Sequence, residues 1–464
     1  MDSSTKRRLA VGFLVNWVGK LATVIIQLVQ VPVFLKYWSV PLYGEWMIVT
    51  AVPAYLNVSS MGFGDVAGNE MTMLMARDDR EGALRAFQSC WWLIVFICAT
   101  CITLLAAALY FFPAANLLRL HAINPTDTKW IIFYLGCSVL LGQLETLLQA
   151  SYRSIGRYSY GSLIKNVYSL VAFGIMILPV FFHGGPRAAA LAFALANLFF
   201  TFLLCFMVSR DIPWIRFGWS HASFAEIRRL APPALAFMAF PVGNALNLQG
   251  TLMAVGYALG PTSVVIFGTA RTVSRVALQM VQIVNNTFTP ELSISFGQHN
   301  IQLTRTLHRR ACQMALIIAV LIVLVMLTVG PWFLTHWTRG HVPPSRPLLA
   351  ILLTVVVFYA LWSTSSVLLS ATNRHQKLAA YYIVGTSITI VFTYLLAKQF
   401  GLYGAAGSLL ISEAIMTLYV LPTSLRMSHD TFGDFFNSML QYPASLKPGA
   451  LLRRISRSKP DLES

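Results

Sequence analysis

The sequence predicts an all-α polytopic membrane protein of about twelve transmembrane helices, arranged as two pseudo-symmetric six-helix halves around a central cavity, with both termini in the cytoplasm. The composition is the first observation: 464 residues, 56% hydrophobic and only 11% charged, with a mean hydropathy of +0.65. A soluble protein of this size is far less apolar. The second observation is that most Lys and Arg residues fall on the side of the amino terminus once the apolar stretches are threaded through a membrane.

The expected membrane spans are apolar stretches of roughly 20 residues, the length that crosses a hydrocarbon core as a helix. In the first half they run from Leu9 to Leu35, Gly44 to Gly64, Cys90 to Phe112, Trp130 to Tyr152, Gly161 to Phe182 and Ala188 to Ser209. In the second half they run from Ala231 to Ala258, Thr262 to Thr289, Cys312 to Thr335, Pro347 to Ala371, Ala379 to Phe400 and Gly404 to Leu425.

A faint internal duplication with a period of about 220 residues supports the division into halves. The stretch that ends at Cys90, for example, parallels the stretch that ends at Cys312. We therefore predict four regions. They are an N-terminal half at 1–209, a cytoplasmic interfacial linker at 210–230, a C-terminal half at 231–425, and a basic cytoplasmic tail at 426–464.

Three basic residues lie near the centres of apolar stretches: Lys20 in the first, and Arg271 and Arg275 in the eighth. A charge at the middle of a membrane helix costs about 2.5 to 3.5 kcal/mol on insertion scales, so such residues usually face a partner or a water-filled cavity. Lys20 lies about 18 Å along the helix axis from Arg8, too far from the helix end for snorkelling. We expect these three cations to line a cavity that accepts an anion.

Polar side chains extend both stretches into one-sided faces about 80 degrees wide. The first face contains Asn16, Lys20, Thr23, Gln27 and Gln30, and the second contains Arg271, Arg275, Gln279, Gln282 and Asn286. In the seventh stretch Asn244, Asn247 and Thr251 repeat the pattern more weakly. Substrate binding is one interpretation of the amides. The alternative is that they tie helices together, as polar side chains do in membrane bundles.

Two acidic residues, Glu145 and Glu413, also lie deep in apolar stretches. A structural salt bridge or a solvated cavity wall is one interpretation of each, and a carboxyl group that loads and releases a proton during transport is the other. Asp65, Glu70 and Glu291 are expected at cytoplasmic helix ends, where gating and helix capping are both open interpretations.

Several functional classes lack their sequence signatures. There is no Walker motif, nucleophile elbow, paired catalytic carboxylate site or metal cluster, so we expect no catalytic residues, no cofactor and no metal. Gly62, Gly64 and Gly68 lack the spacing of a nucleotide-binding loop and favour helix unwinding or close packing. The net charge of +17 is spread between apolar segments, which argues against binding of nucleic acid.

A family resemblance rests on Val31–Leu35, Leu42–Trp46 and Met61–Gly64, followed by Asn69 and Glu70. This pattern resembles the bacterial polysaccharide-export proteins, which are the O-antigen and exopolysaccharide flippases of the multidrug, oligosaccharidyl-lipid and polysaccharide exporter superfamily. The likeness is best over residues 16–87 and extends to 224–233. The remainder of the chain agrees mainly in helix number and duplication.

The resemblance implies a multi-pass protein of the bacterial inner membrane that is a flippase and not an enzyme. It would move an undecaprenyl-pyrophosphate-linked oligosaccharide to the periplasmic leaflet by alternating access. The substrate and the lipid bilayer would be its partners, with a polysaccharide polymerase or ligase as a further one. The main rival is a cation-coupled multidrug antiporter of the same superfamily, whose cationic cargo the cavity cations would repel. A peptidoglycan-precursor flippase would need two more helices, and a glycosyltransferase would need catalytic acids and large loops.

Overall fold

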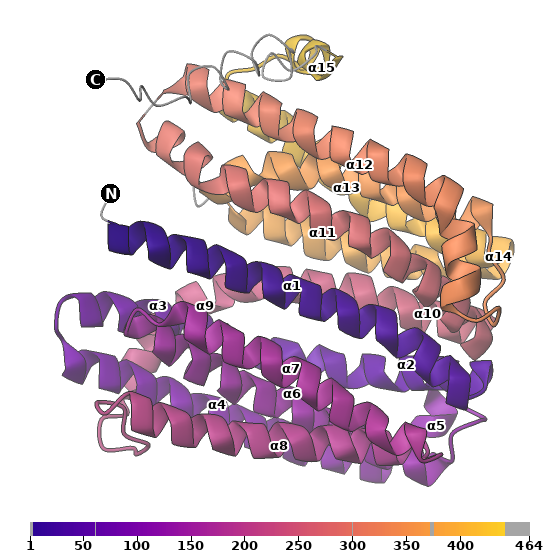
Figure 1. Ribbon diagram of the computed structural model, residues 1–464, viewed down its shortest axis with the longest axis horizontal. Coiled ribbons are helices and arrows are strands. Elements are labelled where there is room, and N and C mark those ends of the chain that lie inside the picture. The colour runs from indigo at the N-terminus through magenta and orange to yellow at the C-terminus, as the bar shows by residue number, and fades with distance from the viewer. Residues whose placement is uncertain (1–2, 61, 299, 372–374, 441–464) are drawn as a thin grey trace, which may run out of the picture. The chain divides into compact units, whose positions relative to one another are not determined.

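The computed structural model describes residues 3–60, 62–298, 300–371 and 375–440, and every regular element in these ranges is helical. Figure 1 shows the elements in chain order. They are α1 (Ser3–Tyr37), α2 (Val40–Ala54), the 3-10 helix η1 (Tyr55–Ser60), α3 (Phe63–Ala76), α4 (Arg80–Phe111), α5 (Ala114–Leu117), α6 (Pro125–Ser154), α7 (Tyr158–Phe181), α8 (Pro186–Asp211), α9 (Phe224–Ala245), the π-helix η2 (Leu246–Gly250), α10 (Thr251–Leu259), α11 (Pro261–Gly297), α12 (Ile301–Trp337), α13 (Arg346–Ala371), α14 (His375–Met427) and α15 (Phe432–Leu440).

Nine helices within the described ranges are long and apolar enough to cross a membrane: α1, α4, α6, α7, α8, α11, α12, α13 and α14. The expected spans that do not appear as separate helices have local explanations. The span at 44–64 is divided among α2, η1 and the start of α3, and the span at 231–258 is divided by η2. The last two spans form the single element α14, in which Gly401 interrupts the helix with φ +61° and ψ −143°. The predicted polytopic all-α class is confirmed.

Side chains at several helix ends explain where those helices begin. Ser39 accepts a hydrogen bond from the Leu42 N–H at the start of α2, Asp79 from the Gly82 N–H at α4, and Asn124 from the Thr126 N–H at α6. These acceptors satisfy backbone donors that have no partner within the helix. Gly62 adopts a left-handed conformation with φ 70° between η1 and α3, which confirms unwinding at this glycine.

The chain divides into two compact units. Unit 1 contains the described residues within 1–272, 331–348 and 386–408, and unit 2 contains those within 273–330, 349–385 and 409–464. In unit 1, α6 packs against α2, α3, α4, α7 and α8, while α1 packs against α7. The core between these helices includes Phe63, Met71, Phe87, Leu147 and Tyr152. Gly68 approaches α6 so closely that a Cβ there would lie 2.5 Å from the Cβ of Ala150.

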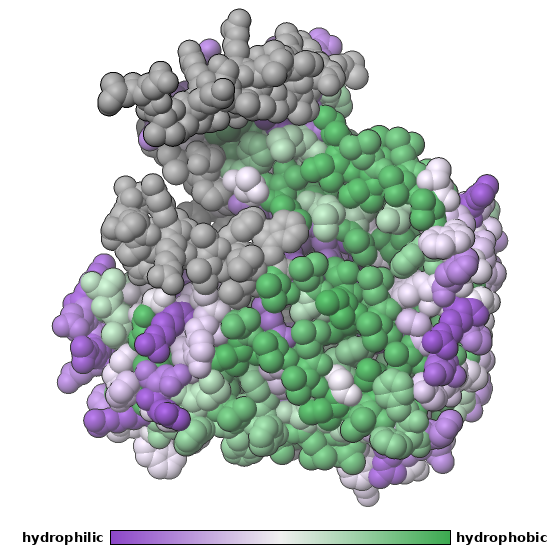
Figure 2. All heavy atoms as spheres, in the orientation of Figure 1, coloured by the Kyte–Doolittle hydropathy of each residue, from purple (hydrophilic) through white to green (hydrophobic). Residues whose placement is uncertain are grey.

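Large apolar side chains point outward along the middle of the helices. Phe96 of α4 and Phe199, Phe202 and Phe206 of α8 are examples with at least 64% of their surface exposed. Over α7 and α8, Figure 2 shows hydrophobic residues along the helices and hydrophilic residues gathered near their ends. This distribution is what a lipid environment requires, because apolar side chains exposed in mid-helix contact acyl chains and not water.

Candidate functional site

Arg271 of α11 reaches the π-helix η2, where the helical path of α9 and α10 is widened. Its Nη2 donates to the Asn247 Oδ1 at 2.5 Å and to the Asn247 carbonyl at 3.0 Å. Its Nη1 donates to the Thr251 Oγ1 at 2.6 Å and to the Leu248 carbonyl at 3.3 Å. A π-helical turn disturbs the usual pattern of backbone hydrogen bonds, and here the guanidinium binds two of the carbonyls in that turn.

Two of the predicted substrate-binding residues, Arg271 and Asn247, therefore bind each other within unit 1. The Arg271 side chain is buried, with 8% of its surface exposed. The sequence left open whether Asn247 binds substrate or connects helices. In the structure its amide oxygen accepts from Arg271 and so connects η2 to α11. In this arrangement Arg271 positions the backbone of η2.

Arg275 follows one turn later on α11 and belongs to unit 2. Its side chain is half-buried, and it forms no hydrogen bond or ion pair with any residue that the structure describes. Farther along α11, Gln279 is half-buried, and the exposed Gln282 donates its Nε2 to the Tyr359 hydroxyl at 3.4 Å. The polar face predicted on α11 thus contains one arginine that binds protein groups and one whose donors no described residue accepts.

Asn285 is a polar residue of α11 that the sequence analysis missed. It lies beside the expected face, donates its Nδ2 to the Ser363 Oγ at 3.3 Å, and accepts from the Thr364 Oγ1 at 2.7 Å. Asn286, which was assigned to the face, is exposed. Periodicity alone does not show which of two adjacent asparagines forms a contact between helices. Here the position of α13 decides it, because Ser363 and Thr364 reach Asn285.

On α1, Lys20 is half-buried, as are Gln27 and Gln30. The neighbouring Gly19 packs on the side chain of Asn166 in α7, so that a Cβ at Gly19 would lie 2.7 Å from the Asn166 amide atoms. Asn166 is a second polar residue that the sequence analysis missed. Its spacing from Ser159, Ser162 and Ser169, by three or four residues at each step, is the helical signal that could have found it. The side chain of Asn16 lies outside the described residues.

Glu145 of α6 is buried in unit 1 and accepts a hydrogen bond from the Thr201 Oγ1 of α8 at 3.0 Å. It forms no salt bridge with a described residue, so the salt-bridge interpretation finds no support here. The buried hydroxyl of Tyr168 in α7 has no hydrogen-bond partner within the part of the chain that the structure describes. The carboxyl group is therefore held by a neutral hydroxyl.

Glu413 of α14 is buried in unit 2, where its Oε2 accepts a hydrogen bond from the Trp362 Nε1 at 2.5 Å. Trp362 packs between the rings of Tyr359 and Tyr382, at centroid distances of 5.3 Å and 5.9 Å. Each unit thus buries one of the predicted carboxyl groups against a neutral donor from another helical segment.

Asp65 and Glu70 of α3 lie in a group of charged residues at the ends of α6 and α9. Glu70 pairs with Arg229 at 2.7 Å, and Asp65 lies 3.9 Å from Arg153. Glu226 also binds Arg229, at 2.6 Å, and the hydrogen bonds that Arg229 donates to both carboxylates raise the pKa of its guanidinium above the usual value. These pairs connect α3 to α6 and α9. The side chain of Glu291 lies outside the described residues.

Glu45 of α2 accepts hydrogen bonds from three backbone N–H groups, and this role was not recognised from the sequence. Its Oε1 accepts from the backbone N–H groups of His121 and Ala122 at 2.6 Å and 2.7 Å, and its Oε2 accepts from that of Ile123 at 2.7 Å. Only 1% of Glu45 is exposed. It holds the loop before α6, which gives a structural reason for an acidic residue in the stretch Leu42–Trp46.

No family model matches the chain, and no curated protein matches it. Solved structures share its fold. An inward-facing multidrug resistance MATE family transporter of the MOP superfamily superposes with a TM-score of 0.74 at 15% identity, covering 91% of this chain and 98% of that chain. An outward-facing structure of such a transporter gives a TM-score of 0.63 at 14% identity, covering 91% and 95%. A MATE structure in the bent conformation gives 0.56 at 16% identity, covering 94% and 95%. The chain therefore has the fold of this class of membrane transporters.

Proposed function

We propose that the chain is a flippase that moves an undecaprenyl-pyrophosphate-linked oligosaccharide across the bacterial inner membrane by alternating access. The resemblance of residues 16–87 to polysaccharide-export proteins supports this proposal, as does the transporter fold. The single observation that carries it is the half-buried side chain of Arg275, whose donors are not used by any described residue.

The position of Arg275 gives this observation its weight. The residue lies near the middle of the apolar span Pro261–Thr289, which contains no Asp or Glu. A cation held at such a depth is costly unless something compensates its charge. A guanidinium presents several N–H donors in a planar fork that matches two phosphate oxygens, so a pyrophosphate is a suitable compensating group.

The two arginines of α11 would then have separate tasks. Arg271 holds η2 and keeps the path of α9 and α10 in place, whereas Arg275 binds the pyrophosphate. Lys20 would add positive charge, and the amides of Asn16, Gln27, Gln30, Gln279 and Gln282 would replace water around sugar hydroxyls. The polyprenyl chain would stay in the lipid.

Coupling is assigned to the two buried carboxyl groups. Glu145 accepts from the Thr201 hydroxyl and Glu413 accepts from the Trp362 indole, and a carboxyl group buried in this way can load and release a proton during transport. Asp65 and Glu70, with Glu291, would act at the cytoplasmic gate, where the pairs with Arg153 and Arg229 would open and close. A polysaccharide polymerase or ligase would receive the product.

A multidrug antiporter is the second candidate, and the fold supports it at least as well. The solved structures described above include transporters of multidrug resistance. Buried carboxyl groups such as Glu145 and Glu413 would suit a cationic cargo or a coupling ion. The two candidates differ in the sign of charge that the site must accept, and an arginine whose donors no described residue uses favours an anion.

The test uses purified protein in proteoliposomes. A fluorescent short-chain polyprenyl-pyrophosphate disaccharide is the first probe, and a membrane-impermeant quencher reports its leaflet. Ethidium movement driven by a proton gradient is measured in parallel. Wild type is compared with Arg275→Ala, Arg275→Glu and Arg275→Lys, and Arg310→Ala is the matched control because Arg310 is an exposed arginine of α12.

We expect wild type and Arg310→Ala to flip the disaccharide lipid. Arg275→Ala should lower the rate about tenfold or more, since a hydrogen bond to a charged group contributes about 1.5 to 3 kcal/mol. Arg275→Glu should abolish flipping, and Arg275→Lys should retain part of it. In cells, Lys20→Glu and Arg275→Glu should abolish surface polysaccharide while the protein stays in the membrane. Ethidium transport without lipid flipping would establish the antiporter instead.

A further inference from the structure

A groove of about 860 Å³ lies in unit 1 where α4 ends and α6 begins. Its walls include Tyr110 and Phe112 from the end of α4, and Trp130 and Phe133 from the first turns of α6. Tyr110 is 79% exposed and Phe112 is 63% exposed. The groove is therefore an open aromatic surface at the ends of two helices that are long and apolar enough to span a membrane.

The location of the groove indicates its surroundings. Trp and Tyr concentrate at the ends of membrane helices, where one side of the ring is apolar and the other is wet. Trp130 stacks with Tyr134 at a centroid distance of 5.5 Å, and Tyr110 contacts Phe111 edge-on at 5.1 Å. Aromatic rings in this position lie at the level where lipid headgroups meet the acyl chains.

The charges around the groove leave one cation in excess. Asp127 is paired with Arg187, at 3.2 Å, and the Arg187 guanidinium lies 5.6 Å from the centre of the Trp130 ring. Lys129, which lines the groove, forms no hydrogen bond or ion pair with a described residue. The acidic residue nearest to it in the sequence, Asp127, is thus already neutralised, and the ammonium of Lys129 remains available to an anion.

We propose that this groove binds a membrane lipid with an anionic phosphate headgroup, with a lipid chain against the aromatic walls and the phosphate at the Lys129 Nζ. An apolar chain suits the exposed rings, and a phosphate suits an ammonium that no described carboxylate neutralises. This assignment is independent of the transported substrate, because it uses none of the residues proposed to bind it.

The test compares lipid retention by native mass spectrometry. Protein is released from nanodiscs of phosphatidylcholine mixed with phosphatidylglycerol, and the two bound lipids are counted. Wild type should retain phosphatidylglycerol preferentially. Lys129→Ala should lower that preference about fivefold, the factor that corresponds to about 1 kcal/mol for one basic residue near an anionic surface. Lys129→Glu should lower it further.

Two further variants keep the result interpretable. Lys36→Ala removes an exposed lysine from the end of α1 and should leave the preference unchanged. Ala106→Trp places a large ring in the groove at an exposed alanine and should reduce retention of both lipids, with the thermal midpoint unchanged. The proposal is wrong if wild type shows no preference for phosphatidylglycerol, or if both Lys129 variants keep the wild-type preference.

Discussion

Two segments at comparable positions in the chain are attached to neighbouring helices by different chemistry. Residues 212–223 follow α8 and lie on α4 in unit 1, while residues 428–440 follow α14 and lie on α12 in unit 2. The predicted duplication pairs α4 with α12. The first attachment uses neutral groups and the second uses an ion pair.

In unit 1 the attachment consists of amide and indole hydrogen bonds. Gln88 donates to the Arg216 carbonyl at 2.9 Å and accepts from the His221 N–H at 2.8 Å. Trp92 donates to the Gly218 carbonyl at 2.9 Å. Phe217 lies edge-on against Phe87, with ring centroids 5.6 Å apart.

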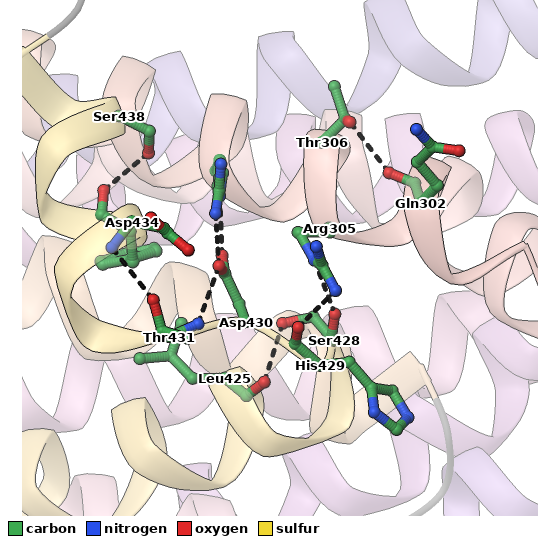
Figure 3. A network of polar contacts seen from close by, with 12 residues as sticks. Gln302, Arg305, Thr306, Leu425, Ser428, His429, Asp430, Thr431, Asp434 and Ser438 are labelled. Atoms are coloured by element: carbon green, nitrogen blue, oxygen red, sulfur yellow. Dashed lines mark hydrogen bonds and ion pairs between the residues drawn. The ribbon is translucent and has the colours of Figure 1, made fainter.

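In unit 2 charged groups dominate, as Figure 3 shows around Asp430 and Arg305. Arg309 binds Asp430 through its Nε at 2.7 Å and also through its Nη2. Arg305 donates to the carbonyls of Ser428, at 3.1 Å, and His429. The ring of Phe435 stacks on His308 at 5.5 Å and is fully buried.

The two attachments share side-chain hydrogen bonds to the segment and an aromatic contact, but they do not share a charged pair. Asp430 in unit 2 is only 1% exposed in its side chain, so its charge depends on Arg309. Gln88 in unit 1 is equally buried but carries no charge. Loss of a partner should therefore cost more in unit 2 than in unit 1.

The largest effect is expected from Phe435→Ala. Truncating a fully buried phenylalanine leaves a cavity and should cost about 3 to 5 kcal/mol. Phe217→Ala, its counterpart, should cost less because Phe217 is 38% exposed. Limited proteolysis read by mass spectrometry should show faster cleavage within 428–440 for the first variant. Equal cleavage rates for the two variants at their own segments would contradict the comparison.

Arg309→Ala should come next. Removing one partner of a buried ion pair costs about 3 to 5 kcal/mol, and the partial exposure of Arg309 should bring the loss to about 2 kcal/mol. The adjacent Arg310 is exposed, so Arg310→Ala is the matched control. The thermal midpoint in detergent should fall for Arg309→Ala alone. A similar fall in both variants would mean that the effect is one of net charge.

Gln88→Leu should have a smaller effect. It leaves the Arg216 carbonyl and the His221 N–H without this partner, but both residues are exposed and water can replace it, so the cost should be about 1 kcal/mol. Cleavage within 212–223 should increase, and this increase should not change between low and high salt. Gln313→Leu is the counterpart in unit 2, where the side chain donates to the Ser438 and Met439 carbonyls at 3.2 Å and 3.3 Å.

A change in salt concentration should have the smallest effect on attachment, but it should distinguish the charged attachment in unit 2 from the neutral one in unit 1. Raising the ionic strength screens charges that water can reach, and the Arg309 side chain is 26% exposed. Release of 428–440 from α12 should therefore increase modestly with salt in the wild type, while 212–223 stays attached to α4. Salt dependence of cleavage in both segments, or in neither, would remove the proposed contrast.

The comparison also shows which parts of the fold were predictable. The membrane helices were predictable from the sequence, because each depends on a continuous run of apolar residues. Within the predicted tail at 426–464, the residues up to Leu440 include α15, whose Phe435 belongs to a buried cluster with Cys312 and Leu421. That cluster depends on residues from three helices, and no local pattern around Phe435 reveals it.

In the candidate site, too, the sequence indicated which residues were unusual but not which contacts they make. Arg271 and Arg275 stood out in the sequence because both are cations in an apolar span. Nothing in their spacing indicated that Arg271 binds η2 while Arg275 donates to none of the described residues. The π-helical turn that distinguishes them arises where α9 continues into α10, more than 20 residues earlier in the chain than Arg271.

The sequence by itself determined the membrane class, the approximate spans and the one-sided polar faces, because the partition of a segment between water and lipid depends on its own composition and periodicity. Only the tertiary structure decided how those polar groups are used. It paired Arg271 with Asn247, Glu145 with Thr201 and Glu413 with Trp362. Such pairs depend on the rotation and separation of helices that are distant in sequence, and hydrogen bonds form only when both are correct to within a fraction of an ångström.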